Sequence, residues 1–389
     1  MKAWFKYILI LIIRNTLKAF SALKINNNKI VLQSFGGRQI SCSPKYIMLY
    51  LNNQEPKKYE FYWAVDDIGK FREWEEYGVK LVKFKSLRFL ILSITAKVFI
   101  TNGYVPSYIP FRKKQFVLST WHGGGAYKRG GLDIVNNIPS YKIVELQTAS
   151  LSKMISSCVA FSEIFHKSFL IPNDKFLNCG LPRNDILINR NVSIMKKVKN
   201  KLQIPQENKV IIYAPTFRSD IGSIEEKFEN GNFKINYKNL IGALKDKFSG
   251  NWTVLFRTHY FLKSNLDSND AIDVSDYPDM QELLCAADIL ITDYSSCMWD
   301  FSLMYKPCFI FATDIAKYKQ ERDFYTPMSE WPFPIASNNE ELVNNILNFN
   351  EADYIEKVKQ HHKALGSYED GHACERVCKL IEEICTEGK

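Results

Sequence analysis

The sequence predicts an α/β protein built from two halves, each a doubly wound parallel sheet covered by helices. Short apolar runs typical of buried parallel strands alternate with helical patterns along the chain. This alternation stops at a charged stretch near residues 189–206 and then starts again. A length of 389 residues is sufficient for two such domains with cores of their own.

The first domain is expected over residues 28–190. Its strand candidates are residues 30–35, 61–66, 79–83, 97–101, 115–120, 156–162 and 175–179. Helical patterns cover residues 46–52, with Pro44 in the first turn, and residues 86–96. Strands separated by helices pair in parallel, because a parallel connection needs a crossover.

The second domain is expected over residues 208–365, with a closing helix at 375–384 inside the terminal segment 366–389. Its strand candidates are residues 210–214, 253–257, 271–274, 288–292 and 307–311. Helical patterns cover residues 234–247, 280–286, 298–305 and 342–346. Two such domains facing each other would bring the carboxyl ends of both sheets to one cleft, where ligands of this fold class bind.

Residues 1–24 predict an amphipathic helix that lies in the surface of a membrane. The apolar run Tyr7–Ile13 is far shorter than the roughly 20 residues needed to span a bilayer. The run is flanked by the basic residues Lys2, Lys6, Arg14 and Lys18. Such flanks suit an anionic membrane surface. The alternatives are a helix buried against the protein, a signal peptide and a short spanning segment.

The net charge of +9 comes from the amino-terminal region. Residues 1–54 hold eight Lys or Arg and no acidic residue, whereas the rest of the chain carries 43 basic and 42 acidic side chains. The nearly neutral body lacks the basic excess typical of nucleic-acid-binding proteins, so no nucleic-acid partner is expected. Nine cysteines without a CxxC pair favour a reducing compartment and no disulfide framework.

The strand-to-helix junction at residues 292–300 predicts a phosphate site. Asp293, Ser295 and Ser296 follow the apolar run 288–292 directly. At such a junction, main-chain N–H groups and short hydroxyls can hold a phosphate.

A second strand end, residues 120–128, predicts a general base. His122 follows the strand candidate 115–120, and Gly123 begins a run of three glycines that lets a ligand approach the main chain. Lys128 adds positive charge nearby. A histidine here could take a proton from an attacking hydroxyl; the alternative is a hydrogen-bonded structural histidine in a tight turn. An esterase oxyanion loop is excluded, because no Gly-x-Ser-x-Gly elbow occurs.

Further strand ends carry candidate anion ligands. Arg257 and His259 follow one strand candidate, and Thr216 and Arg218 follow another. An arginine offers a rigid donor fork that matches phosphate. The alternatives are exposed loop residues and ion pairs with neighbouring acids.

Two loops supply the remaining substrate-binding candidates. Arg183, Asn184 and Asp185 close the segment Gly-Leu-Pro-Arg-Asn-Asp, where the alternatives are an ion pair and a helix N-cap. Arg322 lies in an aromatic-rich loop, which either lines a nucleotide pocket or simply packs.

Several common site types are absent from the sequence. There is no P-loop and no Gly-x-Gly-x-x-Gly segment, and the six histidines lack zinc spacing, so no metal site is predicted. The pair His361-His362 is expected in a solvated turn of a helix.

Together these residues resemble the CDP-glycerol glycerophosphotransferase family, the teichoic acid primases and polymerases. Five motifs of that family occur in order, at residues 120–128, 180–185, 213–218, 257–259 and 292–296. The likeness extends from about Ser34 to Arg376. Three segments depart from the family pattern: HGGGAYK replaces HGTPLK at 122–128, RDFY replaces RGFY at 322–325, and RTHY replaces RxHP at 257–260.

The resemblance implies two Rossmann-like domains of the GT-B type, with CDP-glycerol bound in the C-terminal one and its pyrophosphate at residues 292–296. It implies that His122 and His259 are needed for activity. It also implies a peripheral protein on the cytoplasmic face of the cell membrane.

The expected reaction moves glycerol phosphate from CDP-glycerol to a hydroxyl of a lipid-linked glycan of the cell surface, with release of CMP. No cofactor is expected, although a loosely bound Mg²⁺ is compatible with the chemistry. The length favours a single-addition or capsule-type transferase over a long-chain polymerase. A CDP-ribitol transferase, a GT-B glycosyltransferase and a non-enzymatic assembly factor are the alternatives. The acceptor, the number of units added and homo-oligomer formation stay open.

Overall fold

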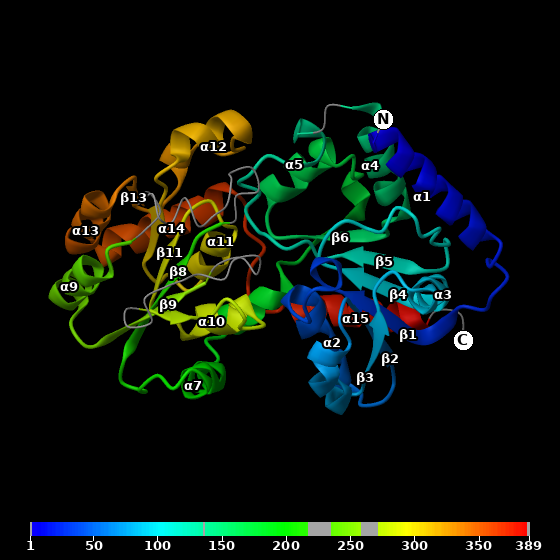
Figure 1. The fold of residues 1–389 in the computed structure, drawn as a ribbon, viewed down its shortest axis with the longest axis horizontal. Coiled ribbons are helices and arrows are strands. Elements are labelled where there is room, and N and C mark those ends of the chain that lie inside the picture. Colours follow the sequence, from blue (N-terminus) through cyan, green and yellow to red (C-terminus); the bar gives the residue numbers. More distant parts are fainter. Residues whose placement is uncertain (1, 135–136, 217–234, 258–270, 387–389) are drawn as a thin grey trace. The chain divides into compact units, whose positions relative to one another are not determined.

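A computed structural model describes residues 2–134, 137–216, 235–257 and 271–386 of the chain (Figure 1). The chain divides into two compact units. The first unit comprises residues Met1–Gly124, Gly130–Asp185 and Gly366–Lys389. The second comprises Gly125–Arg129 and Ile186–Leu365. Each unit is an α/β fold around one parallel sheet, as the sequence predicts.

In the first unit, the described residues form a seven-stranded sheet in the order β3-β2-β1-β4-β5-β6-β7. Its strands are β1 (Asn26–Gln33), β2 (Glu60–Val65), β3 (Val79–Lys83), β4 (Ala96–Thr101), β5 (Phe116–Ser119), β6 (Lys153–Ser156) and β7 (Phe176–Asn178). All pairs are parallel, and Gln33 of β1 pairs in register with Thr101 of β4. The strand order reverses between β1 and β4, so their carboxyl ends form the switch point where doubly wound sheets bind ligands.

Helices cover both faces of this sheet. They are α1 (Lys2–Lys18), α2 (Cys42–Gln54), α3 (Leu87–Thr95), α4 (Ile138–Ser150), α5 (Val159–Ser168) and α15 (Ala373–Thr386), with short helical turns η1 (Phe35–Gly37), η2 (Gly69–Tyr77), η3 (Gly131–Ile134), η4 (Asn173–Lys175) and η5 (Pro182–Asn184). Side-chain caps begin some of them: the Ser86 hydroxyl accepts from the N–H of Phe89 at 3.2 Å at the start of α3.

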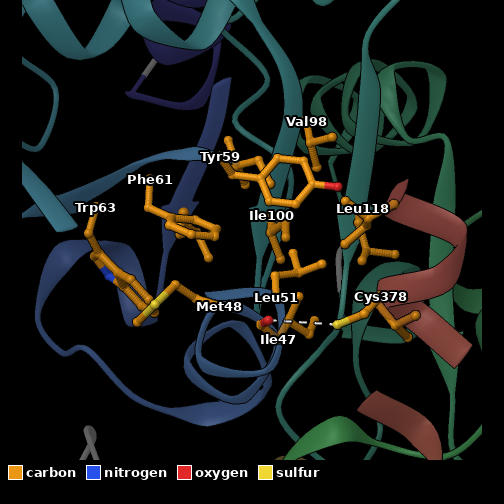
Figure 2. Close-up of a cluster of buried hydrophobic side chains, with 14 of the residues drawn as sticks. Ile47, Met48, Leu51, Tyr59, Phe61, Trp63, Val98, Ile100, Leu118 and Cys378 are labelled. Carbon is orange, nitrogen blue, oxygen red and sulfur yellow. Dashed lines mark hydrogen bonds between the residues drawn. The ribbon is translucent and has the colours of Figure 1, made fainter. Parts of the chain in front are cut away.

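The C-terminal helix α15 completes the core of the first unit. Figure 2 shows Phe61 and Trp63 of β2 above Ile47 of α2, with Cys378 of α15 beside them. The Cys378 thiol lies 3.7 Å from the carbonyl oxygen of Ile47. Residues more than 300 positions apart in the chain therefore share one apolar cluster, which holds the terminal segment in this unit.

The second unit repeats this architecture. Within the residues that the structure describes, its six parallel strands have the order β10-β9-β8-β11-β12-β13. They are β8 (Lys209–Ala214), β9 (Trp252–Phe256), β10 (Ile272–Asp273), β11 (Ile289–Thr292), β12 (Cys308–Phe311) and β13 (Ile335–Ala336). The order reverses between β8 and β11, whose ends pair at Ala214 and Thr292.

The helices of the second unit have side-chain caps of the same kind. They are α6 (Asp185–Ile188), which starts at the boundary of the first unit, α7 (Val192–Lys201), α9 (Tyr237–Phe248), α10 (Met280–Ala286), α11 (Cys297–Ser302), α12 (Ile315–Glu321), α13 (Asn339–Leu347) and α14 (Glu351–Ala364), with the turn η6 (Met328–Glu330). Asn236, Asn338 and Asn350 each accept a main-chain N–H at the start of α9, α13 and α14.

The short segment Gly125–Arg129 belongs to the second unit although it follows β5 of the first. Its main chain runs antiparallel to residues 323–325, with a bridge between Lys128 and Phe324. The N–H of Tyr325 donates to the carbonyl of Tyr127 at 2.8 Å. The Tyr127 hydroxyl lies 2.8 Å from Nε2 of His361 on α14. Main-chain and side-chain bonds therefore fix this segment in the second unit.

One predicted strand is wrong. Residues 156–162 were expected to be a strand, but β6 ends at Ser156 and α5 begins at Val159. The Cys158 thiol accepts from the N–H of Phe161 at 3.4 Å and caps the new helix. A short apolar run of this kind fits a strand and a buried helix equally well, so its period could not decide between them.

The expectation that His361 and His362 are solvated is also wrong. Both lie on α14 and are only 9% and 8% exposed. Nε2 of His362 lies 2.8 Å from the Ser302 hydroxyl, and its ring packs on Trp299. Burial lowers the pKa of each histidine from 6.5 to about 4, so both are neutral at pH 7.

Helix α1 docks on α4 in the first unit. The Arg14 guanidinium donates to the carbonyls of Ser107 and Ile109 at 2.9 and 2.7 Å, and Ile10 and Leu17 are buried. Among the described helices, none has the length and apolar character that crossing a bilayer requires.

Acidification is expected to destabilise the protein through His361 and His362. The unfolded chain binds protons at these residues near pH 6.5, whereas the folded chain binds them only near pH 4. The free energy of unfolding should therefore fall as the pH drops from 6.5 to 4, by up to about 3 kcal/mol per histidine. Urea unfolding across this range measures the slope.

The variant pair His361→Gln and His362→Gln keeps hydrogen-bonding groups but cannot titrate, so it should flatten the slope. His372→Gln, at an exposed histidine, is the matched control and should leave the slope unchanged. A double variant that loses stability on acidification as steeply as the native chain would contradict this account.

Gly125→Ala is expected to destabilise the second unit by about 2–4 kcal/mol. Gly125 has a φ of +70°, and a Cβ there would lie 2.5 Å from the Tyr127 ring and 2.7 Å from the Trp299 ring. Gly242→Ala on α9 is the control, since its Cβ would meet nothing within 4 Å and alanine favours helix. Equal urea midpoints for the two variants would refute the clash.

Candidate active site

The structure places His122 at the carboxyl edge of the first sheet, directly after β5. Its Nδ1 lies 2.8 Å from the carbonyl oxygen of Asn102, the residue that follows β4. A carbonyl only accepts, so Nδ1 carries the hydrogen of this bond. In the neutral imidazole, the lone pair is then on Nε2, the atom that a general base uses.

Neighbouring strand ends hold the imidazole in place. It stacks on the Trp121 ring at 4.7 Å between centroids and meets the edge of Phe35, from the loop after β1, at 5.8 Å. The Asn102 side-chain oxygen accepts from the N–H of Phe35 at 2.8 Å. The ends of β1, β4 and β5 thus converge on His122, at the switch point of this sheet.

A small apolar recess lies beside Trp121 in the first unit. It is open to solvent on one side. Its wall includes Tyr104, Val144, Leu151 and Phe169. The loop that carries Trp121 and His122, called the histidine loop below, therefore has apolar surroundings on the side of Trp121.

The candidates of the 180–185 motif face protein groups. Arg183 is 4% exposed, and its Nη1 donates to the carbonyl of His122 at 2.8 Å. Nδ2 of Asn184 donates to Oε1 of Glu369 at 2.9 Å, and the N–H of Leu181 donates to Oε2 of the same carboxylate at 3.0 Å. The motif therefore connects the histidine loop to the C-terminal segment.

Asp185 caps the C-terminal helix rather than its own short helix. Its carboxylate accepts from the N–H groups of Ala373 and Cys374, the first residues of α15, at 3.1 and 2.7 Å. Burial raises the pKa of Asp185, and these two donors partly offset that effect. The N-cap anticipated at Asp185 exists, but the capped helix is 188 residues further along the chain.

In the second unit, Thr216 and Asp293 meet at the switch point between β8 and β11. The carboxylate of Asp293 accepts from the N–H of Thr216 at 2.9 Å and from its hydroxyl. It also accepts from the N–H of Tyr294 at 2.5 Å. Asp293 is buried, so the carboxylate fixes the two strand-end loops to each other.

Ser295 and Ser296 follow this carboxylate and begin α11. Both are half-buried, and the Ser295 hydroxyl lies 3.4 Å from the N–H of Cys297. Between Asp293 and Ser295, the buried ring of Tyr294 stacks on Tyr318 at 4.2 Å. The two hydroxyls thus stand on a rigidly packed turn.

Lys128 lies on one of the two paired segments of the second unit, and Arg322 directly precedes the other. The Lys128 ammonium lies 5.7 Å from the centre of the Tyr318 ring. Nε of Arg322 donates to the carbonyl of Arg129 at 3.0 Å, and Arg129 pairs with Asp323. Pairing of 125–129 with 323–325 brings these cations to one side of the unit.

Arg257 lies after β9 and reaches toward β10. Its Nη1 donates to the carbonyls of Val274 and Tyr277 at 3.1 and 2.7 Å. Burial lowers the pKa of its guanidinium below the ordinary value of arginine. The predicted phosphate ligand is therefore anchored by the loop that leads to α10.

Two candidates, Arg218 and His259, lie outside the described residues. Within the described ranges, no group of three His, Cys, Asp or Glu side chains is placed to hold a metal ion. Sequence reasoning missed Asn102, although this residue follows a strand just as His122 does. It also missed Glu369, for which the sequence offers no signal.

Comparison with known proteins identifies a family. Residues 15–383 match the family described as CDP-glycerol:poly(glycerophosphate) glycerophosphotransferase. A teichoic acid glycerol-phosphate transferase of Staphylococcus aureus is 32% identical over 384 residues, which cover 95% of this chain and 96% of that protein. A teichoic acid poly(glycerol phosphate) polymerase of Bacillus subtilis is 31% identical over 86% of this chain, which spans 45% of that longer protein.

A solved structure of the wall teichoic acid polymerase TagF superposes with a TM-score of 0.80 and 28% identity, over 99% of this chain and 97% of that one. The fold of the chain, with one parallel sheet in each unit, is therefore similar to that of this polymerase. The family match over residues 15–383 includes all five motifs that the sequence carries. The chain is a member of the CDP-glycerol:poly(glycerophosphate) glycerophosphotransferase family.

Proposed function

We propose that this protein transfers glycerol phosphate from CDP-glycerol to a hydroxyl of a lipid-linked, teichoic acid-type acceptor. The acceptor oxygen attacks the phosphorus that carries glycerol, and a new phosphodiester bond forms. The bond between this phosphorus and the bridging oxygen breaks, and CMP leaves with that oxygen. The acceptor proton goes to Nε2 of His122 and from there to solvent.

The hydrogen bond between His122 and Asn102 is the observation that carries this proposal. It places the hydrogen on Nδ1, so Nε2 has the lone pair that accepts a proton. The imidazole is exposed at a sheet edge, where an acceptor can reach it. Trp121 and Phe35 restrict its orientation, as a base that acts in one direction requires.

The donor diphosphate is assigned to the second unit. The Thr216 hydroxyl donates to the Asp293 carboxylate at the switch point of this sheet, and Ser295 and Ser296 follow that carboxylate in the chain. The motif residues Arg257 and His259 would offset the charge that grows on CMP as it leaves. Arg218, Lys128 and Arg322 are assigned to the same anion by their motifs.

Peripheral attachment to the cytoplasmic face of the membrane is part of the proposal. The side of α1 that does not dock on α4 exposes Trp4, Phe5, Ile8, Leu9 and Ile12. These positions recur at helical spacing and form one apolar stripe. Basic residues at positions 2, 6 and 18 flank it, which suits an anionic leaflet and a lipid-linked acceptor.

Purified protein should release CMP from CDP-glycerol in the presence of a lipid-linked glycan acceptor. His122→Ala should lower this rate about 100-fold or more, because the acceptor hydroxyl loses its base. The release of CMP and the mass of the product, which gains one glycerol phosphate per transfer, measure the reaction.

His166→Ala is the matched control, since this exposed histidine also bonds a carbonyl in the first unit. It should keep native activity. Parallel reactions with CDP-ribitol, UDP-glucose and added EDTA test the donor and the metal requirement. If the rate of CMP release by a folded His122→Ala protein falls less than threefold, His122 is not the base. If the protein turns over another donor faster than CDP-glycerol, that donor is the substrate.

The triple variant Phe5→Ser, Ile8→Ser and Ile12→Ser should weaken binding to vesicles of phosphatidylglycerol and phosphatidylcholine at least tenfold. These side chains are 72%, 51% and 58% exposed, so their loss removes apolar area without disturbing the core. Leu87→Ser, at a side chain 70% exposed on α3, should bind as the native protein does. Unchanged sedimentation of the triple variant with vesicles would refute the α1 surface.

A further inference from the structure

The buried guanidinium of Arg183 acts on the histidine loop. Its Nη1 lies 2.8 Å from the carbonyl oxygen of His122 and 3.4 Å from the thiol of Cys42. At 4% exposure, the side chain is enclosed by the first unit. We infer that Arg183 is a positioning residue that fixes the His122 peptide, rather than a ligand of the substrate anion.

The histidine loop needs such a restraint because its own conformation is unfavourable. Trp121 has a φ of +50°, which is an unfavourable conformation for a bulky residue. The chain after His122 continues into glycines, which have the greatest conformational freedom. Hydrogen bonds restrain the histidine at both its ring and its main chain: Asn102 holds the ring at Nδ1, and Arg183 holds the carbonyl.

The arginine is in turn held by its neighbours in the motif. The Glu369 carboxylate binds the N–H of Leu181 and the side chain of Asn184. Gly180 has a φ of +80°, and a Cβ there would lie 2.9 Å from Glu369. Glu369 of the C-terminal segment therefore holds the turn that carries Arg183 on both sides of this residue. The guanidinium of Arg183 is thereby kept in one position.

The residue type supports this role. Arginine presents rigid, planar donors, whereas lysine offers a flexible ammonium that is more strongly hydrated. A lysine could retain the charge but would not hold the carbonyl in the same place. The variant Arg183→Lys thus distinguishes the effect of holding the His122 carbonyl in place from the effect of the positive charge.

The test rests on the proposed function and compares kcat with KM. Arg183→Lys should lower kcat about tenfold or more, because small displacements of a base cost large factors in rate. The KM for CDP-glycerol should change less than about twofold. Val377→Ala on α15 is the control: it opens a cavity in the same core without touching the histidine loop, and it should keep native kcat.

A readout independent of activity follows the His122 ring directly. In the native protein, ¹⁵N NMR of labelled histidine should show one tautomer with the hydrogen on Nδ1. Arg183→Lys should show a mixture of tautomers at this histidine, while Val377→Ala should not. If the native enzyme fails to turn over CDP-glycerol, the proposed function is wrong, and the spectra still decide whether Arg183 positions the ring.

Two outcomes would overturn the inference. A KM for CDP-glycerol raised tenfold with kcat intact would make Arg183 a donor ligand. Native kcat and a native tautomer in Arg183→Lys would leave it a purely structural residue. Glu369→Ala, which loosens the same turn from the other side, should lower kcat several-fold with KM unchanged; it decides the matter if Arg183→Lys does not fold.

Discussion

The hydrogen bond from His122 to the main-chain carbonyl of Asn102 is the interaction on which the proposed chemistry depends. It needs two parallel strands, β4 and β5, to end side by side, so that Asn102, the residue after β4, meets His122, three residues after the end of β5. A main-chain acceptor cannot ionise or rotate away, so it fixes the tautomer at every pH at which the histidine is neutral. The sheet itself therefore orients the imidazole that we propose as the base.

In the second unit, a side chain rather than a main-chain carbonyl connects the ends of two neighbouring strands. There the Asp293 carboxylate joins the loops after β8 and β11 by accepting from both the N–H and the hydroxyl of Thr216. A buried carboxylate is costly unless donors satisfy it, and three donors do so here. These hydrogen bonds to Asp293 keep the short hydroxyls of the two loops in fixed positions. Fixed hydroxyls suit the binding of an anion better than the catalysis of proton transfer.

The sequence predicted most of the scaffold because strand ends and buried runs are local signals. Val79–Lys83 and Met280–Ala286 have the predicted bounds. The 180–185 motif was harder to interpret. Its partners, Glu369 and the start of α15, lie more than 180 residues away, so no local pattern shows that Asp185 is a cap. Burial of His361 likewise depends on Tyr127, a residue 234 positions earlier.

The connection after His122 gives weight to the restraints that this histidine receives within its own unit. His122 belongs to the first unit, whereas Gly125–Arg129 is fixed in the second by its pairing with residues 323–325. Only glycines separate the two, and a glycine linker transmits position poorly. The packed segment Gly125–Arg129 therefore does not determine the position of the proposed base. We infer that Asn102 at the ring and Arg183 at the carbonyl set the position of the proposed base, while Asp293 orders the candidate anion-binding loops of the second unit.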